Sequence, residues 1–215
     1  SDNSGGFFTS PEISTMLSLL SIVDNPHQDV PLTSVLRSPI FGFTPDELAQ
    51  IRICNRTSDF YTALCEAAEF LPKCRSFLQT LQGFRARAAD FPVDQMIWSI
   101  YTETDLMALC STMPDGNLRR QRLMVLFRYA GQFESDGNHG LFLFLAWINR
   151  LIARGEEPRL ETDTAQNAVS ILSIHKSKGL EFPIVILARM SGKFNRIDLN
   201  DTLLLHSELG LASDM

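Results

Sequence analysis

The sequence has no hydrophobic run long enough to cross a membrane. Its strongest apolar stretch, residues 141–148, ends at Asn149 and Arg150, well short of the ~20 residues that a membrane-spanning helix needs. The N-terminus has neither the basic flank nor the apolar core of a signal peptide, and it does not begin with Met. These absences predict a globular, soluble, cytoplasmic chain without membrane attachment, and the missing Met predicts a fragment of a longer protein.

Cysteine is scarce and unpatterned. Cys54, Cys65, Cys74 and Cys110 form no C-x-x-C pair, and no histidine stands at ligand spacing from them. Neither a disulfide framework nor a zinc site is therefore indicated. We predict buried free thiols and no metal ligands.

An excess of positive charge is also absent. The chain carries 19 Lys and Arg against 25 Asp and Glu, for a formal net charge of -6. Binding to a nucleic-acid backbone needs clustered cations, so this balance argues against a uniformly basic nucleic-acid binder but leaves room for a local patch. Such clusters occur at Arg119, Arg120 and Arg122 and at Arg85 and Arg87. Solvated helix faces are the favoured interpretation of both.

Helical periodicity dominates the first three quarters of the chain. A helix is predicted after Ser10, which can cap it, with Pro11 at the first helical position and Glu12 at the positive end of the helix dipole. One face of this helix is apolar. Its members are Ile13, Met16, Leu17 and Leu20.

Proline and capping residues predict the next boundaries. The first helix stops at Asn25-Pro26, and a second runs from Asp29 to before Ser38-Pro39. Residues 44–47, Thr-Pro-Asp-Glu, predict a capping box that opens a third. Further helical patterns cover residues 59–70, 72–89, 92–110, 117–133 and 140–153.

Large apolar side chains recur at helical spacing in two of these segments, where we assign them to the core and not to a base-stacking platform. They are Trp98 and Tyr101, then Phe142, Leu145 and Ile148.

The pattern changes beyond a polar stretch at residues 154–166, which is typical of a linker. Residues 168–174 and 183–188 are apolar and β-branched, as expected for strands buried on both faces of a parallel sheet, and residues 202–206 form a third such run. Two or three strands cannot close a doubly wound sheet. The sequence therefore predicts a mainly α protein, with a multi-helix domain over residues 1–160 and a partial α/β segment over residues 161–215.

A polar loop with one glycine connects the first two predicted strands. Gly179 permits close backbone approach, Lys176 and Lys178 supply compact positive charge, and the Glu181 carboxylate can accept two hydroxyl hydrogen bonds. Ligands of open α/β folds bind at the carboxyl ends of strands, so these residue types suggest an anionic-ligand site. On residue types alone, an ordinary turn with solvated lysines is an equally good interpretation.

The order of residues in this region resembles helicase motif V. A strand that ends at Ser173-Ile174-His175 is followed by residues 178–183, Lys-Gly-Leu-Glu-Phe-Pro, and by a second strand. This register is similar to that of the UvrD-like superfamily 1A DNA helicases, with Ser173 where the family usually has Thr.

The N-terminal half resembles the same family at the start of its 2B domain. The similarity lies in residues 5–8, 11–13, 24–29 and 36–39. Within the family, the chain looks most like the A subunit of the bacterial AddAB helicase-nucleases, and residues 203–211 support that narrower resemblance.

The resemblance implies a function for the loop. His175 would contact the DNA backbone, together with Ser173, Lys176 and Lys178, whereas Glu181 and Gly179 would lie at ATP. The loop would then couple the nucleotide state to the grip on DNA.

The resemblance also implies a larger context. Residues 1–160 would be a 2B-like domain, with Arg119, Arg120 and Arg122 as candidate DNA contacts, and residues 161–215 part of a RecA-like 2A lobe. The parent protein would use ATP and Mg²⁺ on single- and double-stranded DNA in double-strand break repair and recombination. Its partner would be the second subunit of a heterodimeric helicase-nuclease.

Phosphate-binding chemistry is missing from the chain. No G-x-x-x-x-G-K-[ST] pattern occurs, since Gly192-Lys193 is followed by Phe194, and no metal-binding carboxylate strand stands out. Phosphoryl transfer needs these parts together, so we predict that the chain alone has no ATPase activity. The alternative interpretation is a helical docking module without direct DNA binding. A nuclease domain within these residues has little support.

Overall fold

The computed structural model describes residues 6–158, 184–187, 203–206 and 210–213 of the 215-residue chain. The chain divides into two units, Ser1–Thr162 and Asp163–Met215. The predicted domains, residues 1–160 as 2B-like and 161–215 as 2A-like, stay predictions.

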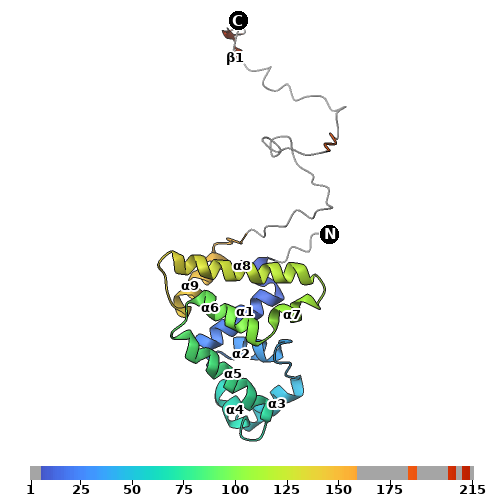
Figure 1. Cartoon of the computed structure of the whole chain (residues 1–215), viewed down its shortest axis with the longest axis vertical. Helices are drawn as coiled ribbons and strands as arrows, with labels where there is room; N and C mark the ends of the chain where they lie inside the picture. Colours follow the sequence, from blue (N-terminus) through green and yellow to red (C-terminus); the bar gives the residue numbers. More distant parts are fainter. Residues whose placement is uncertain (1–5, 159–183, 188–202, 207–209, 214–215) are drawn as a thin grey trace. The chain divides into compact units, whose positions relative to one another are not determined.

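The first unit is helical throughout its described part (Figure 1). None of these helices is long and apolar enough to cross a membrane. In chain order the elements are a 3-10 helix η1 Phe7–Thr9, α1 Pro11–Asp24, α2 Asp29–Arg37, α3 Pro45–Cys54, α4 Phe60–Ala67, α5 Pro72–Ala88, α6 Val93–Glu103, α7 Leu106–Ser111, α8 Gly116–Ser135 and α9 Leu141–Ala153.

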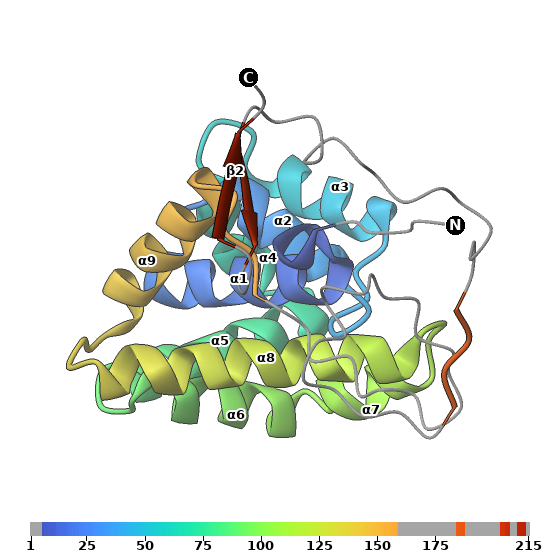
Figure 2. The same ribbon diagram turned by 90° about the horizontal axis from the view of Figure 1, so that it is seen from above.

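The α1 helix is the centre of this unit. It packs against α2, α5, α8 and α9, so side chains on several of its sides are covered (Figure 2). Buried residues include Ile13, Met16, Leu19, Leu20 and Ile22. A helix that is apolar around most of its circumference is stable only when other helices surround it. The predicted apolar face is thus confirmed and is wider than expected.

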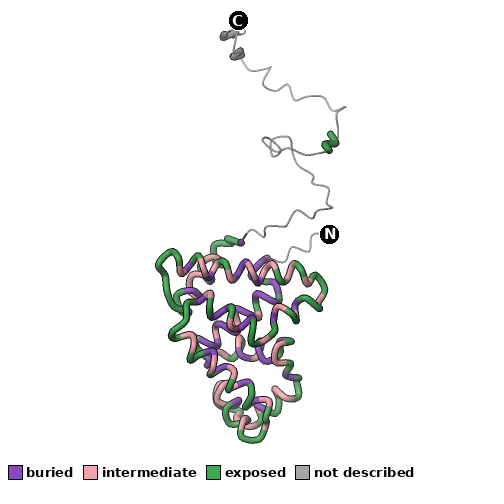
Figure 3. Tube along the Cα trace, viewed as in Figure 1, coloured by how far each residue is buried: buried purple, intermediate pink, exposed green. Residues whose placement is uncertain are grey.

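The remaining helices form two groups. The α6, α7 and α8 helices contact one another, and α3 and α4 pack together at the far end of α5 (Figures 1 and 2). Burial follows the inward side of each helix (Figure 3). The polar sides remain exposed to solvent, as expected for helices at the surface of a bundle.

Two predicted boundaries are confirmed by the structure. The Glu47 N–H donates to Thr44 Oγ1 over 3.2 Å, and the Thr44 N–H donates to Glu47 Oε2 over 2.7 Å, which completes the capping box. The second helix begins at Asp29 and ends at Arg37, directly before Ser38.

The prediction that Ser10 caps α1 through its side chain is wrong. Ser10 Oγ donates to the Phe7 carbonyl oxygen over 2.7 Å and accepts no hydrogen bond from α1. The reason is η1, which immediately precedes α1 and offers an acceptor at hydrogen-bonding distance.

The helix predicted over residues 92–110 is interrupted. It forms α6 and α7, separated at Thr104 and Asp105, where Asp105 has a positive φ of 51°. Aspartate tolerates this left-handed conformation better than most residues. Apolar spacing continues across the break, so periodicity alone could not reveal it.

The assignment of the aromatic residues to the core is only partly right. Tyr101 and Ile148 are buried, but Trp98 is 48% exposed and Phe142 is 67% exposed. Leu145 is half-buried. Helical spacing places these residues on one side of a helix without showing how far the neighbouring helices extend over that side.

In the second unit, the described residues include a two-stranded antiparallel sheet. β1 Leu203–His206 pairs with β2 Gly210–Ser213, with Leu204 opposite Ala212. β1 lies within the third predicted run, but its pairing is antiparallel and local. Residues 184–187 are not assigned to a strand, and residues 168–174 lie outside the described part. The described residues therefore do not show the predicted partial α/β segment with parallel strands.

Candidate functional site

The loop predicted to couple ATP to DNA lies outside the described residues, so each of its assignments stays a prediction. The residues concerned are Ser173, His175, Lys176, Lys178, Gly179 and Glu181.

The arginine cluster of α8 is well described, and two of its three members point into the unit. Arg119 Nη1 lies 2.8 Å from Glu12 Oε2, and Arg122 Nη1 lies 2.9 Å from Glu12 Oε1. Arg119 Nε also donates to the Pro114 carbonyl oxygen over 2.9 Å. One carboxylate thus ties the start of α1 to the first two turns of α8.

Burial makes this ion-pair network part of the interior. The Glu12 side chain is 1% exposed, against 22% for Arg119 and 13% for Arg122. Arg122 Nε is buried without a hydrogen-bond partner in the described part of the chain. Charges this deep are tolerated only when they are paired. Arg119 and Arg122 are thus structural ion-pair partners of Glu12.

Glu12 is the residue that sequence reasoning missed. The sequence indicates only a favourable charge at the helix N-terminus, and Arg119 lies 107 positions away. An acidic residue in the first turn of a helix is common and carries no signal for a distant partner. A buried position for it follows only from the packing of α8 on α1.

Arg120 is the member of the cluster that remains on the surface. Its side chain is exposed, and it makes no hydrogen bond or ion pair within the described residues. Arg120 therefore presents a positive charge to solvent on α8.

The second basic pair, on α5, is also engaged internally. Arg85 Nε donates to the Val23 carbonyl oxygen over 3.2 Å, and Arg87 Nη2 lies 2.8 Å from Glu103 Oε2. The prediction of simple solvated helix faces thus underestimates how these side chains connect α5 to α1 and α6.

The two buried thiols, those of Cys74 and Cys110, are not activated. Burial, with the negative charge of Glu12 adding to it, raises the pKa of Cys110, and burial raises the pKa of Cys74 to about 11. All four cysteines are free, as predicted, but Cys65 is exposed and Cys54 only half-buried. A nucleophilic thiol needs a lowered pKa, so Cys74 and Cys110 have no catalytic character. Among the described residues, no group of three or more His, Cys, Asp and Glu side chains could hold a metal ion.

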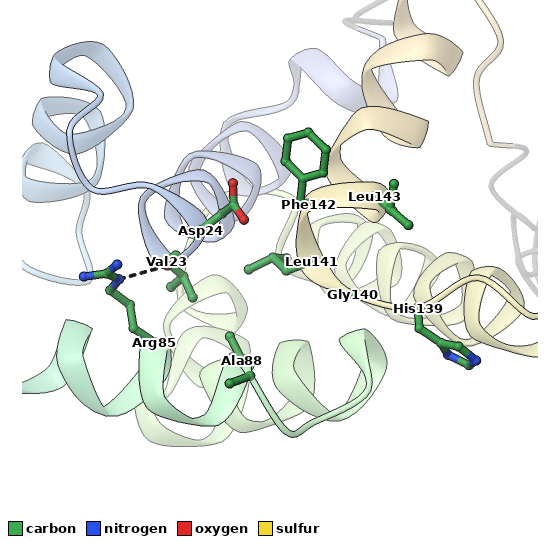
Figure 4. Close-up of a pocket in the computed structure, with 10 residues that line it drawn as sticks. Val23, Asp24, Arg85, Ala88, His139, Gly140, Leu141, Phe142 and Leu143 are labelled. Carbon is green, nitrogen blue, oxygen red and sulfur yellow. Dashed lines mark hydrogen bonds between the residues drawn. The ribbon is translucent and has the colours of Figure 1, made fainter.

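An open cavity of about 360 Å³ lies where the ends of α1 and α5 meet the start of α9 (Figure 4). Leu141 points toward Val23, and His139 points away from both. The lining mixes apolar and polar residues, with Asp24 and Arg85 as its charged members. No residue here is predicted as functional from the sequence.

Comparisons with known proteins cover nearly the whole chain. The model of the UvrD-like helicase C-terminal domain matches residues 2–195. Proteins named as the A subunit of an ATP-dependent helicase/nuclease are similar over 99% to 100% of the chain: that of Clostridium novyi at 43% identity and that of Acetivibrio thermocellus at 42%. The protein of the same name from Geobacillus kaustophilus is 42% identical over 99% of the chain. The chain spans 18% of the length of each of these relatives.

Proposed function

Because the chain belongs to the UvrD-like helicase C-terminal domain family, we propose that it is a segment of an ATP-dependent DNA helicase, the A subunit of a helicase/nuclease. The parent protein would act in double-strand break repair and recombination, and its partner would be a second subunit. The observation that supports this most strongly is 43% identity over 99% of the chain to a relative of that name.

Within the parent, the loop at residues 173–181 would link nucleotide and DNA. His175 would contact the DNA backbone, and the Glu181 carboxylate has the acceptor chemistry that the two ribose hydroxyls of ATP require. Lys176 and Lys178 fit phosphate as compact cations. When bound, ATP with Mg²⁺ would supply the free energy for strand separation.

The proposal is tested in the full-length parent. We expect ATP hydrolysis stimulated by single-stranded DNA, and we expect His175→Ala to weaken that stimulation more than it weakens hydrolysis without DNA. Glu181→Gln should mainly raise the KM for ATP. A parent that hydrolyses no ATP with DNA present would contradict the helicase proposal.

The 215-residue chain by itself should not turn over ATP. It lacks the phosphate loop and the metal-binding carboxylate on which phosphoryl transfer depends. The measurement is phosphate release from the purified chain with Mg²⁺ and single-stranded DNA. DNA-stimulated release that co-purifies with the chain would refute this prediction.

A second candidate function is a helical docking module that makes no direct DNA contact. The internal pairing of Arg119 and Arg122 with Glu12 favours it, because two of the three predicted DNA contacts are engaged elsewhere. Titration of duplex DNA at several salt concentrations separates the two functions. Affinity that falls as salt rises supports DNA contact, whereas absence of binding at low salt supports docking.

Arg120 provides the sharper comparison in that titration. If α8 contacts DNA, Arg120→Ala should weaken binding and reduce the salt slope by about one without changing the folded structure. Thr102→Ala, an exposed uncharged position on α6, is the control. Equal affinity of the two variants for duplex DNA would show that Arg120 does not contact DNA.

A further inference from the structure

The tripeptide Asp-Gly-Asn occurs twice in the chain, once at each end of α8. Residues 115–117 lie at the start of the helix, and residues 136–138 follow its last residue (Figure 2). An aspartate before glycine is prone to isomerisation, because glycine has no Cβ atom to hinder attack by its backbone nitrogen on the aspartate side chain. Both aspartates are exposed. The two sites therefore share their local sequence and their access to water, and differ in how the fold holds the backbone.

The reaction proceeds through a cyclic imide. The glycine nitrogen attacks the carboxyl carbon of the aspartate side chain, a C–N bond forms, and one C–O bond of the carboxyl group breaks with release of water. Water then opens the ring at one of its two carbonyl groups. Opening at the side-chain carbonyl restores aspartate, whereas opening at the backbone carbonyl gives isoaspartate, whose main chain runs through the former side chain. Water is lost once and gained once, so no cofactor or oxidant takes part.

Ring closure requires rotation about the Cα–C bond of the aspartate at both sites. The ψ angle is 32° at Asp115 and 6° at Asp136. A ψ angle this close to zero places the next backbone nitrogen beside the aspartate's own nitrogen and away from its side chain. The rate at each site therefore depends on how freely the backbone turns there.

The backbone at Asp115 is held by the packed start of α8. Its carbonyl oxygen accepts from the Arg119 N–H over 3.0 Å, and Arg119 is itself fixed by its ion pair with buried Glu12. Gly116 lies so close to α7 that a Cβ atom on it would be 2.7 Å from the Ser111 carbonyl oxygen. Rotation at Asp115 would break this hydrogen bond and move α8 against α7.

The backbone at Asp136 lacks this support. Its carbonyl oxygen accepts no hydrogen bond within the described part of the chain, and residues 136–140 are all exposed. Gly137 has a positive φ of 81°, and a Cβ atom on it would meet nothing within 4 Å. Rotation at Asp136 therefore meets no packed neighbour.

Two hydrogen bonds close this end of α8 and must open before the ring forms. The Gly137 N–H donates to the Glu134 carbonyl oxygen over 3.0 Å, and the Asn138 N–H donates to that of Phe133 over 3.3 Å. This pattern is typical of a helix that ends at a glycine. Hydrogen bonds at exposed helix ends open at a small cost in free energy, far below that of global unfolding.

We propose that Asp136 is a site of spontaneous isomerisation to isoaspartate in the folded chain, whereas the fold protects Asp115, which is followed by the same two residues. The inference rests on the two backbone environments and does not depend on the helicase function.

Isoaspartate at position 136 changes how α8 ends. It adds one carbon atom to the main chain between Glu134 and His139, which points away from the cavity at the start of α9 (Figure 4). Glu134 Oε2 lies 2.6 Å from His139 Nδ1, and Glu134 Oε1 accepts from the Val93 N–H over 2.8 Å. The longer main chain displaces His139 and leaves the bond to Val93, since only His139 lies beyond the modified residue.

Peptide mapping of the aged chain tests the proposal. The purified 215-residue chain is kept for weeks at neutral pH and physiological temperature and is then digested with trypsin, which cleaves after the arginines of α8 and so places the two sites on separate peptides. Liquid chromatography with fragmentation mass spectrometry measures the isoaspartate fraction of each peptide. The matched reference is the same chain kept in guanidinium, where neither site is held by the fold.

We expect the isoaspartate fraction at position 136 to exceed that at position 115 several-fold in the folded chain, and the two fractions to be similar in guanidinium. Asp136→Glu should abolish the product at position 136 and leave that at position 115 unchanged. Equal conversion of the two sites in the folded chain, or conversion of neither, would overturn the proposal. A preference for position 136 that persists in guanidinium would also overturn it, because the cause would then be the preceding residues, Pro114 and Ser135, and not the fold.

Discussion

At the residue scale, Glu12 has the largest expected effect on stability. Glu12→Gln removes the charge that pairs with Arg119 and Arg122, and both guanidinium groups then remain mostly buried without a counter-ion. We expect a loss of about 3 kcal/mol in the free energy of unfolding. Urea denaturation of the 215-residue chain measures it.

Glu69→Gln is the matched control for that substitution. Glu69 is exposed, and surface substitutions of this kind usually change stability by less than about 0.5 kcal/mol. Equal denaturation midpoints for the two variants would show that the buried ion pairs add no net stability.

Asp59 links stability to acid pH. Its carboxylate caps α4 by accepting from the Thr62 N–H over 3.0 Å, and it lies 3.2 Å from His27 Nδ1. The hydrogen bond from the Thr62 backbone is the main cause that lowers the pKa of Asp59 from 3.8 to about 2. The stabilisation is therefore present above pH 3.8 and is lost as the pH falls toward about 2.

The variant Asp59→Asn isolates this contribution. Asparagine retains a side-chain acceptor at the helix N-terminus but does not titrate. We expect the Tm of the variant to fall less steeply than that of the unmodified chain between pH 3.8 and about 2. Parallel profiles of Tm against pH for the two proteins would show that Asp59 does not contribute to the loss of stability in acid.

At the scale of elements, Gly116 controls how α8 begins. A Cβ atom at this position would lie 2.7 Å from the Ser111 carbonyl oxygen and 2.9 Å from that of Cys110. Both neighbours are backbone atoms and cannot move aside cheaply. We expect Gly116→Ala to destabilise the chain by about 1–3 kcal/mol, as measured by thermal unfolding.

Gly131→Ala, on the same helix, is the matched control. A Cβ atom there meets nothing within 4 Å, and alanine is the better helix former by roughly 0.5–1 kcal/mol. The two substitutions should therefore change stability in opposite directions. A destabilised Gly131→Ala variant would contradict the proposed cause.

Helix boundaries were predictable where the signal is local. The capping box at Thr44 and Glu47 and the extent of α2 agree with the structure, because their hydrogen bonds or proline stops lie within a few residues. The start of α1 at Pro11, directly after Ser10, is also confirmed, but the side-chain cap by Ser10 and the unbroken helix through Asp105 were wrong. The Ser10 hydroxyl donates to the Phe7 carbonyl oxygen instead, and Asp105 adopts a left-handed backbone conformation. The residue pattern is the same whether or not these local conformations form.

At the scale of the whole helical unit, the reactivity of the buried cysteines shows whether the unit unfolds cooperatively. Cys65 is exposed, whereas Cys74 on α5 and Cys110 on α7 are buried. Burial raises the pKa of both buried thiols, that of Cys74 to about 11. We expect Cys65 to react first with a thiol reagent, and Cys74 and Cys110 to react only when the unit unfolds.

Mass spectrometry after pulsed alkylation in increasing urea makes the measurement. Because both residues belong to one continuous core, Cys74 and Cys110 should become reactive at the same urea concentration. Reaction of Cys110 at lower urea would show that α7 opens separately from α5.

The sequence by itself determined the helical character of the first unit, most of its boundaries and, through residues 173–183, the family to which the chain belongs. These properties depend on neighbouring residues, and the family model confirms the last of them over residues 2–195. What the tertiary structure alone decided is which charges and aromatic rings are buried. Glu12 pairs with arginines more than 100 positions away, and Phe142 remains exposed at a cavity. Both depend on how helices pack against one another, and helical spacing along the sequence does not contain that information.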